Sequence, residues 1–195
     1  MNVTSSISSA TEPAGPAQVI AFWRHAGPKR WFAADPAFDA AIRNRFEALH
    51  ARAAAGQLYS WEENAPAALA LILVADQFPR NLYRHSALAF ATDEMARNVA
   101  DRALARGFDQ MTKPSLRSFF YLPFEHHEDE ASQARAVALF EKLAAETGEN
   151  DGLDWCKLHQ GLIVRFGRFP HRNAVLGRLP TQEETLYLAQ GGFAG

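Results

Sequence analysis

Apolar residues recur at helical spacing along most of this sequence. Phe38, Ile42, Phe46 and Leu49 fall on one face of a helix, and Asp35-Pro36 stands directly before it. Aspartate is a favoured N-cap and proline fits the first helical turn, so we expect this helix to begin there and to end near Gly56. The spacing is typical of an amphipathic helix that buries one face.

Similar patterns, bounded by capping residues, glycine and proline, predict further helices over residues 17–25, 65–75, 86–106, 112–121, 134–147, 153–166 and 182–190. The segment 65–75 is so rich in Ala and Leu that we expect a buried central helix, which delivers Asp76 at its end. Ser60 and Thr181 each begin a capping-box pattern. Pro79 and Pro123 are expected to break the helices in which they occur.

No sustained alternating run of β-branched residues bounded by hairpin turns occurs. The sequence therefore predicts an all-α fold of seven to nine helices in antiparallel pairs, stacked in the manner of a helical-repeat solenoid. Residues 1–16 are rich in Ser, Thr, Ala, Gly and Pro and predict a flexible tail. Residues 17–195 are expected to form a single all-helical domain.

Composition narrows the classes of function. The chain has 195 residues, 48% of them hydrophobic, and a net charge of -2 with a pI near 6.4, which argues against nucleic acid or a membrane surface as partner. The single cysteine, Cys156, cannot form an internal disulfide, and a buried inert thiol is the plainer interpretation. With no apolar stretch long enough to span a membrane, we expect a cytoplasmic protein.

Three polar segments share one design, in which an apolar helix ends near a proline that is followed or preceded by charged residues. The first polar segment (residues 76–84) carries Asp76, Arg80, Asn81 and Arg84, and the second (residues 123–128) carries Glu125, His126, His127 and Glu128. The third (residues 159–178) has four arginines and two histidines but no acid: His159, Arg165, Arg168, His171, Arg172 and Arg178, with Asn173. Buried arginines need acceptors, so we expect the three segments to meet.

This convergence has three interpretations. It is a salt-bridge network that only fixes how the helices dock, or a site whose surplus positive charge binds an anionic small molecule or a peptide, or an enzyme site acting on such an anion. The candidate ligand-binding residues are Arg80, Asn81, Arg84, Glu125, His126, Glu128, Arg165, Arg168, Arg172, Asn173 and Arg178. In an enzyme, His171 or His159 would be the general base, with Glu125 as the acid or as the residue that orients that histidine. A protein-interaction scaffold is a further alternative, in which the network is purely structural.

Metal binding has weak support. Glu125 and Glu128 are three residues apart, but His127 would fall on another face of a helix, and the neighbouring arginines would repel a cation. We therefore expect no metal and no cofactor. The sequence does not indicate an oligomeric state.

The motifs of the three polar segments resemble one bacterial family. They are Asp76-Gln77-Phe78-Pro79-Arg80-Asn81, Tyr121-Leu122-Pro123-Phe124-Glu125-His126 with Glu128, and Arg165-Phe166-Gly167-Arg168-Phe169-Pro170-His171-Arg172-Asn173 followed by Leu176-Gly177-Arg178. Long motifs in this order resemble the family of domain of unknown function 924, over about residues 19–193. The resemblance implies a tetratricopeptide-repeat-like α-α superhelix but no established reaction, cofactor or partner. This chain departs from the family pattern at His127, where a small polar residue is expected.

Overall fold

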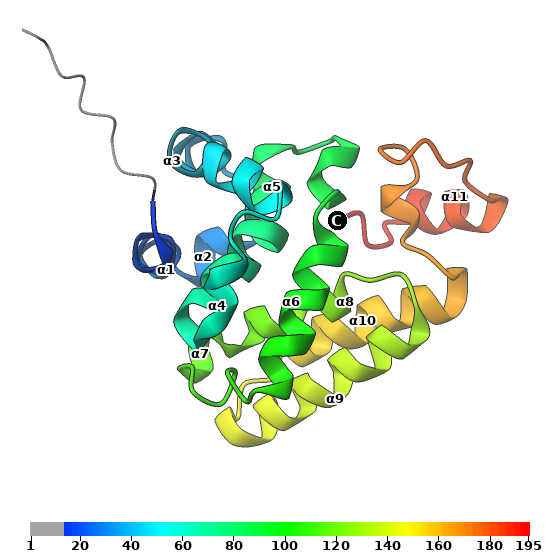
Figure 1. Cartoon of the computed structure of the whole chain (residues 1–195). Helices are drawn as coiled ribbons and strands as arrows, with labels where there is room; N and C mark the ends of the chain where they lie inside the picture. Colours follow the sequence, from blue (N-terminus) through cyan, green and yellow to red (C-terminus); the bar gives the residue numbers. More distant parts are fainter. Residues whose placement is uncertain (1–13) are drawn as a thin grey trace, which may run out of the picture.

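The computed structural model describes residues 14–195, and every regular element in that range is helical (Figure 1). The expectation of a tail over residues 1–16 falls almost entirely outside the described residues. Seven helices of this part of the chain are eight residues or longer, which agrees with the predicted all-α fold of seven to nine helices. None of the helices between residues 14 and 195 combines the length and apolarity that a membrane crossing requires.

The N-terminal helices surround an aromatic core. They are α1 (Pro16–Ala26), α2 (Pro28–Trp31) and α3 (Pro36–Ala54). Asp35 caps α3 as expected, since its Oδ1 accepts hydrogen bonds from the backbone N–H groups of Ala37 and Phe38 at 3.0 and 3.1 Å. The fully buried ring of Trp23 lies 5.9 Å from that of Phe38, so α1 and α3 are joined through aromatic contacts.

The buried central helix forms as predicted, but its ends differ. It consists of α4 (Ala65–Ile72), a π-helical turn η2 (Leu73–Gln77) and α5 (Phe78–Leu82), after a 3-10 turn η1 (Tyr59–Glu63). The predicted capping box at Ser60 is wrong, because Asn64 caps α4 by accepting from the N–H of Ala67 at 3.0 Å. Pro79 does not break the helix either.

A hydrogen bond from another segment helps the helix to continue through Pro79. Proline has no N–H to offer to the carbonyl four residues earlier, which is that of Ala75. The hydroxyl of Thr92 donates to this carbonyl oxygen instead, at 2.6 Å. The backbone group that proline leaves unpaired is thereby satisfied from another segment.

The segment predicted as one helix over residues 86–106 is divided. A 3-10 turn η3 (Ala87–Phe90) precedes α6 (Asp93–Ala105), which packs beside α4 (Figure 1). The next elements are short: α7 (Pro114–Arg117), η4 (Ser118–Phe120) and α8 (Leu122–Glu125). Pro114 and Pro123 stand in the first turns of α7 and α8, so Pro123 begins a helix where we expected it to break one.

The last third begins with an antiparallel hairpin of α9 (Glu130–Thr147) and α10 (Asp151–Phe166), and both helices end at a glycine with positive φ, Gly148 and Gly167. It continues with η5 (Pro170–Arg172) and α11 (Gln182–Ala189), whose capping box at Thr181 is confirmed. A second small core of Leu162, Ile163 and Phe169 holds this region together. The tetratricopeptide-like arrangement remains a prediction.

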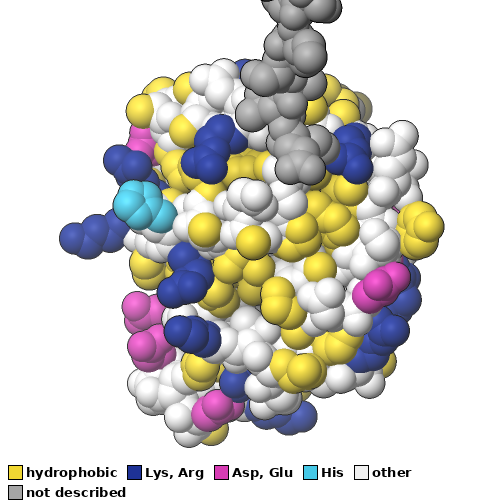
Figure 2. Space-filling view, turned by 60° about the vertical axis from the view of Figure 1, so that its left-hand side comes forward, with side chains coloured by type: hydrophobic (Ala, Val, Ile, Leu, Met, Phe, Trp, Pro, Cys, Tyr) yellow, Lys and Arg dark blue, Asp and Glu magenta, His cyan; other side chains and the backbone are white. Residues whose placement is uncertain are grey.

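One side of the molecule can be judged for charge. On the face around α1 and α3, Lys and Arg side chains lie scattered among hydrophobic ones, and acidic side chains lie near them (Figure 2). This face therefore offers no continuous basic surface of the kind that binds nucleic acid.

Candidate functional site

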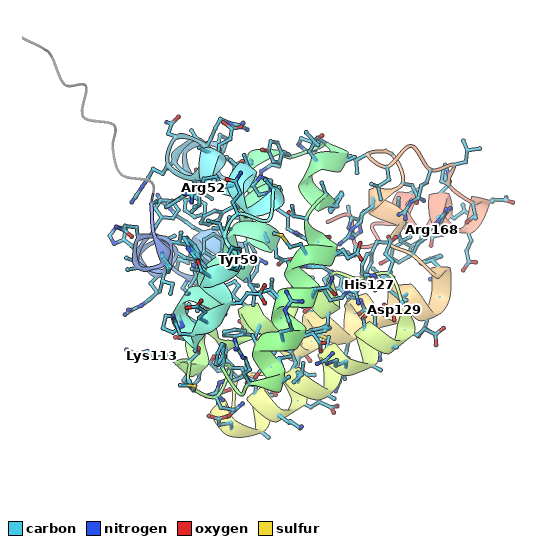
Figure 3. The ribbon with its side chains drawn as sticks, in the orientation of Figure 1. Arg52, Tyr59, Lys113, His127, Asp129 and Arg168 are labelled. Carbon is cyan, nitrogen blue, oxygen red and sulfur yellow. The ribbon has the colours of Figure 1, made fainter. Side chains whose placement is uncertain are left out.

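The three polar segments meet where α5, α6, α8, α10 and η5 come together. We call the residues that meet there the polar cluster. Its members are Asp76, Arg80, Asp93, Glu125, His126, Glu128, His159, His171, Arg172 and Arg178. Figure 3 shows His127, Asp129 and Arg168 on the α11 side of the molecule, away from Arg52 and Tyr59.

Asp76 is the most deeply buried member of the cluster, and the π turn η2 carries it. Its Oδ1 lies 2.8 Å from His126 Nδ1 and 3.4 Å from Arg80 Nη1, and its Oδ2 accepts from Gln77 Nε2 at 2.6 Å. Burial alone would raise the pKa of Asp76, but the charges of Arg80 and His126 and the hydrogen bonds outweigh it and hold the pKa well below its usual range. Asp76 is therefore a buried carboxylate.

Glu125 and His159 form a second carboxylate–imidazole pair. Glu125 Oε1 lies 2.5 Å from His159 Nδ1, and the Glu125 residue is only 3% exposed. Glu125 and His126 are neighbours at the end of α8, so one short helix supplies a member of each pair. In both pairs the carboxylate faces the Nδ1 side of the ring.

Arg80 and Arg172 share one carboxylate. Arg80 Nη1 and Nη2 donate to the two oxygens of Asp93 at 3.0 and 3.1 Å, and Arg172 Nη1 lies 3.9 Å from Asp93 Oδ2. The Arg172 guanidinium lies over the rings of Phe90 and Phe169, at 4.5 and 4.6 Å from their centroids.

Arg172 is a cation whose nearest carboxylate oxygen, Asp93 Oδ2, lies as far as 3.9 Å away. It also donates to the carbonyl oxygen of His126 at 3.0 Å. Burial, and then the like charge of Arg80, lower the pKa of Arg172 to about 10, so it remains a cation at neutral pH.

Glu128 and Arg178 fix the loop around η5. Arg178 donates to both carboxylate oxygens of Glu128 at 2.6 and 3.0 Å, and to the carbonyl oxygen of Phe169 at 3.0 Å. The N–H of Phe169 donates to Glu128 at 2.7 Å, and Arg178 Nε donates to Asn173 at 3.0 Å. This pair therefore positions the segment that carries His171 and Arg172.

His171 is held as a neutral imidazole. Burial lowers its pKa to about 4, with help from the charge of Arg172. Among the described residues, three buried polar atoms of the cluster have no hydrogen-bond partner: Glu125 Oε2, Arg172 Nε and His171 Nδ1. Such atoms are uncommon in folded proteins.

Several predicted ligand-binding residues lie outside the cluster. Arg84 and Asn81 both bind Asp39 on α3, at 2.6 to 2.8 Å. Arg165 pairs with Glu183 at 2.8 Å on the surface, and Arg168 pairs with both oxygens of Glu184 at 2.6 and 2.8 Å.

The predicted surplus of positive charge is therefore wrong, because the fold supplies acids that the sequence analysis did not include. They are Asp39, Asp93, Glu183 and Glu184. All four acids lie in the first turn of a helix, where acidic residues are favoured. The helix that begins at Asp93 was expected to begin seven residues earlier, which hid the signal at that position.

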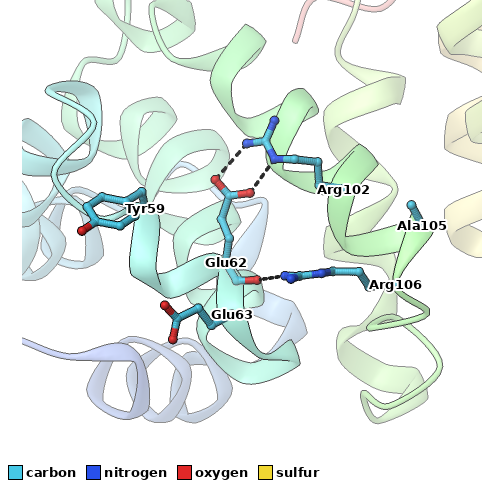
Figure 4. A pocket seen from close by; sticks show the side chains of 6 residues that line it. All are labelled: Tyr59, Glu62, Glu63, Arg102, Ala105 and Arg106. Atoms are coloured by element: carbon cyan, nitrogen blue, oxygen red, sulfur yellow. Dashed lines mark hydrogen bonds and ion pairs between the residues drawn. The ribbon is translucent and has the colours of Figure 1, made fainter.

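Among the described residues the polar cluster holds no candidate metal site, and the open cavity lies elsewhere in the molecule. His127 pairs with Asp129, and within residues 14–195 no group of three or more His, Cys, Asp or Glu side chains is arranged to hold a metal ion. An open cavity of about 530 Å³ lies between η1 and α6, lined by Tyr59, Glu62, Glu63, Arg102, Ala105 and Arg106. Arg102 donates to both oxygens of Glu62 across it (Figure 4).

Comparisons with known proteins agree with the fold. Residues 19–192 match the family described as bacterial protein of unknown function (DUF924). The chain is also similar to a solved structure of a protein of unknown function, ATU0120 from Agrobacterium tumefaciens, with 46% identity and a TM-score of 0.86. That match covers 90% of this chain and 97% of the other. No curated protein matches the sequence significantly.

Proposed function

The chain belongs to the bacterial family of unknown function DUF924, and for this member we propose an enzyme that uses histidine as a general base on a small substrate with an acidic group. One observation carries the proposal: two carboxylate–imidazole pairs, Asp76–His126 and Glu125–His159, share adjacent residues at the end of α8, its last residue Glu125 and its C-cap His126. A single such pair is common as a structural contact. Two that converge with a buried guanidinium support the proposal of an acid–base site.

The geometry within each pair supports a catalytic use. A carboxylate on Nδ1 fixes the ring orientation and the tautomer, which leaves Nε2 to accept a proton. The carboxylates are buried while the imidazole side chains of His126 and His159 keep 15% and 14% of their surface exposed. Each imidazole thus keeps part of its surface exposed while the carboxylate that orients it is buried.

Arg172 supplies the means to hold an acidic substrate. Its guanidinium lies over two phenylalanine rings and shares Asp93 with Arg80. A carboxylate or phosphate group would offer it a closer partner, with two parallel hydrogen bonds. We assign Arg172 to substrate binding, and His159 and His126 to proton transfer.

Covalent catalysis by cysteine has no support in this region. Cys156 is fully buried, and burial together with the negative charge of Glu125 raises the pKa of its thiol. The reaction we propose is therefore proton abstraction, from water or from the substrate itself. A single buried thiol also suits a reducing compartment, so we place the enzyme in the cytoplasm.

The test is turnover of a bacterial metabolite extract, followed by mass spectrometry. Wild-type protein is compared with His159→Gln and His126→Gln, and with His127→Gln as the matched control, because the His127 imidazole pairs with Asp129, which is not a member of the polar cluster. We expect at least one acidic metabolite to be consumed, with the rate reduced about 100-fold in the first two variants and unchanged in the third. Equal consumption by all four folded proteins would refute the assignment.

Binding of an anion without turnover is the second candidate, and Arg172 favours it. Thermal shifts with citrate and inorganic phosphate test it on wild type and Arg172→Gln. If both anions stabilise only the wild type and no metabolite is consumed, the protein is an anion-binding protein.

A further inference from the structure

The segment Gly191–Gly195, which we call the C-terminal strap, turns back from α11 toward the middle of the molecule (Figure 1). Gly191 has φ +84°, and the N–H of Gly192 donates to the carbonyl oxygen of Tyr187 at 3.0 Å. The N–H of Phe193 donates to the Tyr187 hydroxyl at 2.8 Å. A Cβ at Gly192 would lie 2.5 Å from the Tyr187 ring, so only glycine lets the strap follow this path.

The strap delivers one aromatic ring to the proposed active site. The Phe193 ring meets the rings of His159 and His171 edge to face, at 4.9 and 5.1 Å between centroids, and lies 5.9 Å from the ring of Trp155. These are the arrangements that aromatic rings prefer. We call the space bounded by His159, His171 and Trp155 the ring slot.

The ring slot adjoins the binding group for an acid. The Phe169 ring lies 5.3 Å from the His159 ring and 4.6 Å from the Arg172 guanidinium, so it connects the two. The slot and the Arg172 guanidinium are therefore linked through one ring, that of Phe169. Phe193 itself is only partly buried, and Ala194 and Gly195 are exposed, so the strap covers the slot from outside.

We propose that the ring slot is a substrate subsite for an aromatic or heteroaromatic ring, and that Phe193 occupies it as a displaceable internal competitor. This inference rests on the proposed function and specifies its substrate as a ring that bears a carboxylate or phosphate. A ligand must displace Phe193 before its ring can enter, so the apparent affinity is reduced by the fraction of molecules in which the strap is closed.

The test compares two probes, phenyl phosphate and inorganic phosphate, by calorimetric titration. Phe193→Ala opens the slot. Phe32→Ala is the matched control, because it removes the same kind of ring from a 68% exposed position in the N-terminal half, far from Phe193 in the sequence. We expect Phe193→Ala to bind phenyl phosphate roughly tenfold more tightly than wild type does, with inorganic phosphate unchanged and Phe32→Ala like wild type. Phe193→Leu, which keeps an apolar side chain in the slot, should fall between the two.

The outcomes separate the two proposals. If phenyl phosphate binds Phe193→Ala no more tightly than wild type while inorganic phosphate still binds both, the ring slot is refuted and the acidic-group site stands. If neither probe binds any of the folded proteins, both the slot and the acidic-group site are refuted. Loss of turnover in the histidine variants is independent of either result and tests the general base alone.

Discussion

The free energy of unfolding should decrease steeply as the pH is lowered below about 6.5, because His171 is buried in its neutral form. The pKa of His171 drops from the ordinary 6.5 to about 4, and each pKa unit corresponds to about 1.4 kcal/mol. The unfolded chain therefore binds a proton below about pH 6.5 that the folded protein does not accept until about pH 4. The contribution is complete above the unfolded pKa and is lost as the pH decreases through this window, by about 3 kcal/mol in all.

The measurement is urea unfolding at pH 7, 6, 5 and 4.5, for wild type and for His171→Gln. Other groups titrate in the same range, so the informative quantity is the difference between the two proteins at each pH. We expect the free energy of unfolding of wild type to lose about 2 kcal/mol more than that of the variant between pH 7 and pH 5. Parallel pH curves for the two proteins would show that His171 binds a proton equally well in the folded and unfolded states, and would refute this account of its burial.

Two further predictions concern the backbone. Thr92→Val should lower the free energy of unfolding by about 1–3 kcal/mol, because the Ala75 carbonyl beside the π turn loses its donor, while Thr92→Ser keeps the hydroxyl and should lose much less; equal losses in thermal or urea unfolding would contradict the role of this hydrogen bond. Gly167→Ala should destabilise the protein by about 1 kcal/mol because its φ is +69°. As a contrast, Gly161→Ala, within α10 and with open space at its Cβ, should stabilise the protein by up to about 1 kcal/mol. If urea unfolding shows that Gly167→Ala is also more stable than wild type, the assigned C-cap is refuted.

The sequence predicts the long helices well because their signals are local. The Asp35 cap, the capping box at Thr181 and the terminal Gly148 each act within a few residues of the helix end that they define. Proline was the main source of error. The rule that proline stops a helix competes with the rule that it begins one, and at Pro79 and Pro123 the local sequence does not decide between them.

The polar cluster could be predicted as a meeting of segments but not as a set of pairs. Glu125, His126 and Arg172 converge as expected, because buried charges need partners and few were available. The partner of each arginine depends on which helix faces it. Arg84 binds Asp39, 45 residues earlier in the chain, and no local pattern indicates such a pair.

The pairing of Glu128 with Arg178 has a consequence for how the protein acquires its structure. The loop around η5 is held by a carboxylate that lies 50 residues earlier in the chain, and its own N–H and carbonyl groups at Phe169 bond to that same pair. Contacts of such long sequence separation form late in folding, because the intervening chain must first be ordered. The final third of the chain, including both histidines of the ring slot, should therefore take shape only after α8 has docked, and the Glu125–His159 pair forms after the Asp76–His126 pair.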